Sequence, residues 1–111
     1  MRKLAVLLAA LAVCAACAIP ALAATSSVKI GDDYFVKDGK APTVTVKKGT
    51  TVKWVWTGVA PHNVSVTKGP AKFRSSIQSK GSFSKKLTKA GTYSIICTVH
   101  QPDMRMTLKV K

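Results

Sequence analysis

The sequence has no glutamate, two histidines, and little acidic charge, with four aspartates among 111 residues. Because the histidines are so few, a metal site that used His62 and His100 would leave no histidine for a second, catalytic metal centre. Helical periodicity is also missing, since no segment sustains it for long. These absences argue against a multi-centre metalloenzyme and against a helical fold.

The first 23 residues have the pattern of a secretory signal: a basic start, an apolar run over residues 4–19 and a small-residue end at 21–23. The run is shorter and less apolar than the roughly 20 apolar residues that a membrane-spanning helix needs. We therefore expect cleavage near Ala24 and a single domain over residues 24–111. Its expected location is the periplasm, with secretion to the outside as an alternative.

One cysteine, Cys97, follows the predicted signal, whereas Cys14 and Cys17 lie within it. An exported domain with one cysteine cannot form an internal disulfide, although thiols in oxidising compartments usually pair. Cys97 is therefore a buried inert thiol, half of an intermolecular bridge, or a metal ligand. Cys17 partly matches the acylation box of bacterial lipoproteins, so that a lipid anchor is a further alternative.

The predicted domain is strongly basic. Of the 18 lysines and arginines, Arg2 and Lys3 lie in the signal, so that 16 remain against four aspartates and give a net charge of +12. The basic residues are scattered along the chain and form no single block, unlike a nucleic-acid surface in which they cluster with aromatics. We expect no nucleic-acid binding. Instead, the charge would steer the domain toward an acidic protein partner or, peripherally, an anionic membrane surface, more weakly as salt rises.

Short apolar–polar alternations separated by Gly, Pro and Asp predict an all-β domain. Seven or eight strands in a domain of this size indicate a Greek-key sandwich of two packed sheets. The strands are expected within 26–38 and at 43–46, 51–56, 62–67, 83–87, 92–97 and 104–110.

Three details of this fold can be predicted more closely. The segments 43–46 and 51–56 flank a turn and are expected to pair as a hairpin. Residues 68–79 should form an irregular crossover with one helical turn. Within 26–38 the apolar positions are Val28, Ile30, Tyr34 and Val36.

The segment 93–106 carries most of the chemical information. Cys97 and His100 are separated by two residues, and Met104 follows His100 after three more, so that one tight loop can bring the three side chains together. A second imidazole would come from His62, which stands after Pro61. Two imidazoles, a thiolate and a weak axial thioether are the ligands of a blue-copper electron-transfer site. Zinc is an alternative, but it favours Cys and His without a thioether.

The chain resembles the cupredoxins, small blue-copper proteins of the plastocyanin, amicyanin and pseudoazurin group. The matching pieces are 52–54, 61–64, 90–93, 97–100 and 104–110. The resemblance implies one copper ion held by four side chains: His62 Nδ1, Cys97 Sγ, His100 Nδ1 and, axially, Met104 Sδ. It also implies that Asn63 tethers the ligand loop, and that the edge of His100 is an electron port ringed by apolar surface.

Three positions depart from the family pattern. Val99 stands where the family often has proline, and the spacing between His100 and Met104 lies between those of amicyanin and plastocyanin. Met106 replaces a usual glycine, which leaves two candidate thioethers. Aligning 108–110 with the family's last strand favours Met104 as the ligand and Met106 as packing.

These features predict a monomer without enzymatic activity that shuttles single electrons between a donor and an acceptor, both larger redox proteins with acidic docking surfaces. Copper storage or delivery at the same site is the alternative. A copper enzyme would need further histidines, and a metal-free interaction domain would not need all four ligands.

Overall fold

The structure is a computed structural model that describes residues 24–36, 39 and 42–111. The predicted signal peptide, with Cys14 and Cys17, lies outside the described residues. No helix within the described residues is both long enough and apolar enough to span a membrane.

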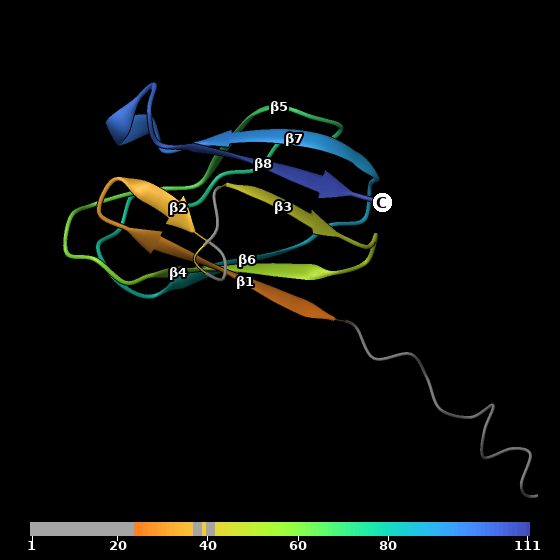
Figure 1. The fold of residues 1–111 in the computed structure, drawn as a ribbon, viewed down its shortest axis with the longest axis horizontal. Helices are drawn as coiled ribbons and strands as arrows, with labels where there is room; N and C mark the ends of the chain where they lie inside the picture. Colours follow the sequence, from red (N-terminus) through yellow and green to blue (C-terminus); the bar gives the residue numbers. More distant parts are fainter. Residues whose placement is uncertain (1–23, 37–38, 40–41) are drawn as a thin grey trace, which may run out of the picture.

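Eight strands form two four-stranded sheets that pack face to face as two layers (Figure 1). One sheet has the order β2-β1-β4-β6 and the other the order β3-β8-β7-β5. The predicted all-β Greek-key sandwich of seven or eight strands is confirmed. The elements are β1 (Thr25–Gly31), β2 (Tyr34–Val36), β3 (Thr43–Val46), β4 (Thr51–Trp56), β5 (Ser65–Lys68), β6 (Ser82–Lys86), β7 (Gly91–Ile96), the 3₁₀ turn η1 (Thr98–His100) and β8 (Arg105–Val110).

The core is the layer of side chains between the two sheets. Alternation along each strand sends every second side chain inward, as the sequence predicts. The inward residues include Val52, Trp54 and Trp56 from β4, Tyr93 and Ile95 from β7 with Cys97 beyond its end, and Met106, Leu108 and Val110 from β8, all at most 6% exposed. The parity predicted for these three segments is confirmed, and it places Cys97 at the end of a buried strand.

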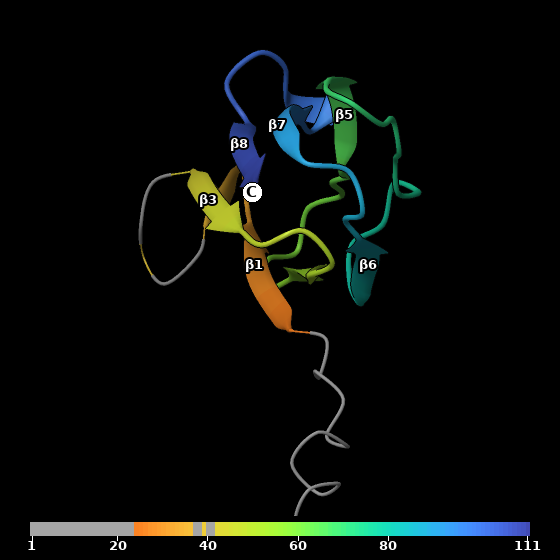
Figure 2. The ribbon, with the colours of Figure 1, turned by 90° about the vertical axis from the view of Figure 1, so that its right-hand side faces the viewer.

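The predicted hairpin between β3 and β4 is wrong, because the two strands lie in different sheets. β3 pairs in parallel with β8, whereas β4 pairs with β1 and β6. Figure 2 shows β3 beside β8 and in the other layer from β1. The turn after β3 crosses between the layers, with Gly49 at a φ of 95° that favours glycine. Alternation specifies a buried face but no neighbouring strand, so that it could not distinguish a hairpin from a crossover.

In β2 the buried residue is Phe35, which was not among the apolar positions named from the sequence, whereas Tyr34 is 53% exposed. A two-residue turn, Asp32–Asp33, joins β1 to β2 and pairs Ile30 with Phe35. Directly paired residues lie on the same face of a sheet, so Phe35 points inward with Ile30.

The segment around β5 is more irregular than predicted. β5 begins at Ser65, and His62 lies ahead of it, in an isolated bridge to Gln78. Residues 69–81 contain no helical turn. These irregular segments can place His62 beside the η1 loop because they are not bound to the regular geometry of a sheet.

Candidate metal centre

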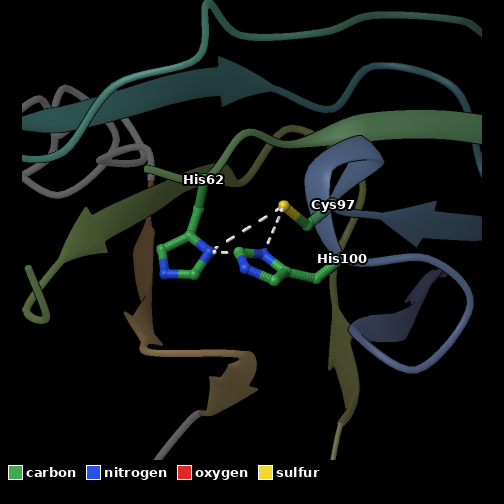
Figure 3. A group of neighbouring side chains, drawn as sticks. All are labelled: His62, Cys97 and His100. Carbon is green, nitrogen blue, oxygen red and sulfur yellow. Dashed lines mark hydrogen bonds between the residues drawn. The ribbon is translucent and has the colours of Figure 1, made fainter. Parts of the chain in front are cut away.

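Three side chains from two distant segments converge at one end of the sandwich (Figure 3). Cys97 follows β7, His100 ends η1, and His62 enters from the loop ahead of β5. The backbone of His62 is fixed by two hydrogen bonds with Gln78, each 3.0 Å, and by Trp56 Nε1, which donates to its carbonyl. Cys97 and His62 are fully buried, whereas the His100 side chain is 29% exposed.

The three potential donor atoms form a compact triangle. The two Nδ1 atoms are 3.2 Å apart, and Cys97 Sγ lies 3.8 Å from His62 Nδ1 and 3.6 Å from His100 Nδ1. Donors bonded to one first-row metal ion at roughly 2.0–2.3 Å are separated by roughly 3.2–3.8 Å when the angles between bonds are 100–120°. The triangle therefore has the size that one such ion requires.

The far nitrogen of each imidazole contacts a carboxylate. His62 Nε2 lies 3.1 Å from Asp32 Oδ1, and His100 Nε2 lies 3.0 Å from Asp33 Oδ1. An ionised carboxylate can only accept a hydrogen bond, so an imidazole in its neutral form donates to it through Nε2–H and leaves Nδ1 unprotonated toward Cys97. Two nitrogen lone pairs and a sulfur atom then face one another, which is the arrangement that a soft or borderline cation satisfies.

Asp32 is held in place from two sides. The backbone N–H groups of Ala60 and Val59 donate to its carboxylate at 2.9 and 3.1 Å. These two hydrogen bonds, and then the one from His62, lower the pKa of Asp32 below its usual value. Gly58 permits this approach, because a Cβ atom at that position would collide with the Asp32 carboxylate.

Sequence reasoning missed Asp32 and Asp33. The available signal was an Asp-Asp pair at a turn in a chain with four acidic residues. That signal identifies an unusual turn but does not say which histidine each carboxylate meets.

The loop that carries Cys97 and His100 is tied at several points. Asn63 Oδ1 accepts hydrogen bonds from the Thr98 backbone N–H at 2.8 Å and from Thr98 Oγ1 at 3.2 Å. The structure thus contains the tether that the resemblance implied. Cys97 N donates to the Met104 carbonyl and Met104 N to the His100 carbonyl, which closes the loop on itself.

The two methionines after this loop have different surroundings. Met104 is 1% exposed and lines a surface pocket together with His100. Met106 Sδ instead accepts a hydrogen bond from Trp54 Nε1 at 3.4 Å, inside the core. The thioether of Met106 therefore already has a partner away from the two imidazoles.

The surface around His100 is more acidic than expected. Val99 is exposed there, in line with an apolar rim, but Asp33 and Asp103 also line the pocket beside His100. The segments 32–33, 57–61 and 98–104 contain three aspartates and no lysine or arginine. The lysines of this basic chain therefore lie outside the loops that carry the imidazoles and their carboxylate partners.

Comparison with known proteins agrees with this donor set. The profile of the copper binding proteins of the plastocyanin/azurin family matches residues 24–111. Plastocyanin from Prochlorothrix hollandica is 37% identical over 92 residues, which are 76% of this chain and 70% of that protein. Amicyanin-alpha from Methylorubrum extorquens is 36% identical over 82 residues, which are 70% of this chain and 66% of that protein.

Solved structures show the same likeness in three dimensions. A reduced Cu(I) amicyanin variant at pH 4 superposes with a TM-score of 0.66 and 32% identity. The match covers 85% of this chain and 88% of that one. The similarity therefore extends over both sheets and the loops between them.

Proposed function

The chain belongs to the plastocyanin/azurin family of copper-binding proteins, and from this premise we propose that it carries single electrons between larger redox proteins. Copper is its cofactor, at a site of the type 1 kind. The proposed ligands are His62 Nδ1, Cys97 Sγ, His100 Nδ1 and, axially, Met104 Sδ. One observation carries the proposal. The Nδ1 atoms of both imidazoles lie within 3.8 Å of the buried Cys97 sulfur, and the Nε2 atom of each ring contacts a carboxylate.

Bound copper supplies one-electron chemistry between its Cu(I) and Cu(II) states. The thiolate and thioether favour Cu(I), whereas imidazoles suit both states. The chain's own contribution is rigidity: Gln78 and Asp32 hold His62, and Asn63 holds the loop of Cys97. A site that moves little between oxidation states exchanges electrons with a small reorganisation cost. Copper bound at Cys97 would also engage the sulfur and protect it from oxidative pairing.

We include in the proposal that the protein is a carrier and not an enzyme. Within the described residues, one cluster of three potential metal-binding side chains is found, and it uses both histidines. The proposal has two further parts. The signal-like pattern of residues 1–23 supports export to a periplasm. We also propose that the exported protein is a monomer in solution.

The test is the spectrum of the copper-loaded protein. The Cu(II) form should bind one equivalent of copper and show an intense blue thiolate-to-copper band that disappears on reduction. Its electron paramagnetic resonance spectrum should show the small copper hyperfine splitting of a strongly covalent Cu–S bond. A colourless protein that yields its copper readily to a chelator would support storage or delivery instead.

Substitution of the two methionines should separate their roles. Met104→Gln should shift the reduction potential strongly, because the axial ligand tunes this kind of site. Met106→Leu should shift it weakly, since the Met106 thioether is bonded to Trp54 in the core. Reduction potentials measured by protein-film voltammetry check this prediction. A larger shift from Met106→Leu than from Met104→Gln would show that Met106, and not Met104, is the axial ligand.

Salt should slow electron transfer with a partner that has an acidic docking surface. The net charge of the chain attracts such a partner over long distances when the Debye length is large, about 30 Å at 0.01 M salt and about 8 Å at 0.15 M. We expect the second-order rate constant to fall about tenfold or more over this range, as measured by stopped-flow absorbance. A flat profile would remove the steering role of the lysines, and a rising one would show that the aspartates around His100 dominate.

A further inference from the structure

The two carboxylates that contact the imidazoles are neighbours in one turn. Asp32 accepts from His62 Nε2 at 3.1 Å, and Asp33 contacts His100 Nε2 at 3.0 Å. We propose that Asp32 and Asp33 are paired positioning residues that fix the ring orientation and the Nε2–H tautomer of both imidazoles from this single turn. The inference rests on the proposed function, because its consequences at copper require both imidazoles to be ligands.

The conformation of the turn allows its two aspartate side chains to contact two different histidines. It closes a two-residue hairpin between Gly31 and Tyr34. Asp33 adopts a φ of 78°, a left-handed conformation that aspartate tolerates better than most residues and that often marks functional positions. Gly58 leaves room for the Asp32 carboxylate against the backbone of residues 59 and 60.

The two contacts differ in exposure. His62 is fully buried, and the Asp32 side chain is 40% exposed; His100 is 29% exposed, and the Asp33 side chain is 64% exposed. Asp32 is additionally held by two backbone N–H groups, whereas Asp33 contacts His100. Asp32 therefore anchors the turn to the His62 loop, and the same turn carries Asp33 to the ring at the surface.

The expected effect on copper follows from ligand basicity. A carboxylate that accepts the Nε2–H of a ligating imidazole makes Nδ1 a stronger donor, and loss of such a partner typically lowers metal affinity about 10–100-fold. A stronger and more negative donor set stabilises Cu(II) more than Cu(I), because Cu(II) carries the greater charge. Both aspartates should therefore lower the reduction potential.

The first experiment compares Asp33→Ala with Asp103→Asn in the full-length copper-loaded protein. Asp103 lines the same pocket as His100 but takes part in neither imidazole contact, so it controls for the loss of one negative charge. Asp33→Ala should weaken Cu(II) binding about tenfold relative to Cu(I), which raises the potential by about 59 mV for one electron. A shift no larger than that of Asp103→Asn would overturn the role of Asp33.

The second experiment needs no copper. Imidazole ¹⁵N chemical shifts of the apoprotein report which ring nitrogen carries the proton. Wild type should show Nε2–H for His62 and His100, whereas Asp33→Ala should add the Nδ1–H tautomer of His100 alone. Unchanged tautomers would overturn the inference even if the blue band is present. Changed tautomers in a protein that forms no blue band would instead reject the copper assignment and keep the contacts.

Asp32 is tested without removing its charge, because Asp32→Ala also deprives two backbone N–H groups of their acceptor and can impair folding. Gly58→Ala places a Cβ atom against the carboxylate and should displace it. The expected result is a mixture of tautomers for His62, unchanged His100, and a raised potential. A His62 tautomer and a potential identical to those of wild type would overturn the role of Asp32.

Discussion

Replacement of Cys97 by serine is expected to abolish the blue absorption band completely and to leave the protein folded. The band requires a sulfur-to-copper bond, and a serine hydroxyl supplies neither the sulfur nor, at neutral pH, an anion. Cys97 is fully buried, so the hydroxyl costs about 1–3 kcal/mol when it lacks a full set of partners. That is less than the roughly 5–15 kcal/mol of a typical domain. Cu(II) titration followed by visible absorbance, with circular dichroism for the fold, checks both statements.

A matched control lies two residues earlier, on the strand β7 that Cys97 follows. Ile95 is fully buried on the inner face of β7, like Cys97. Ile95→Val should cost about 0.5–1.5 kcal/mol and keep the full blue band, which separates loss of a ligand from general loosening of the core. A Cys97→Ser protein that still turned blue would remove Cys97 from the site.

The convergence of Cys97 and His100 could be predicted from the sequence because this information is local. Cys97, His100 and Met104 lie within one short segment, and the parity of the flanking strands states which side chains point inward. His62 was identifiable because the chain offers no other histidine besides His100. Because the chain has only two histidines, the second imidazole could be assigned without any information about the spatial arrangement.

The rest of the site depends on contacts that local patterns do not contain. Asp32 and His62 are 30 positions apart in the sequence and are in hydrogen-bond contact in the structure. Nothing in the spacing of the two residues predicts this contact. The same limit explains the wrong hairpin, since alternation in β3 and β4 states only that each has one buried face. It also explains Phe35, because one turn of two residues decides the parity of the strand that follows.

The largest effect on stability is expected from Trp54→Ala. Trp54 is fully buried in the centre of β4, with its ring about 6 Å from those of Phe73 and Phe83. Truncation removes the fully buried indole from this aromatic cluster and should cost about 3–5 kcal/mol, a large part of a typical domain's stability. Urea unfolding of the apoprotein, followed by circular dichroism, measures the loss.

Trp54→Phe separates packing from the hydrogen bond and links the core to the copper site. Phenylalanine keeps an aromatic ring but lacks the N–H that donates to Met106 Sδ. The loss of stability should therefore be clearly smaller than for alanine. Because Met106 packs in the core while Met104 is the proposed axial ligand, the blue band and the reduction potential of Trp54→Phe should stay close to wild type. A strong change in either would mean that the Met106 thioether, released from Trp54, reaches the metal, so Trp54 would then be what keeps the second methionine out of the site.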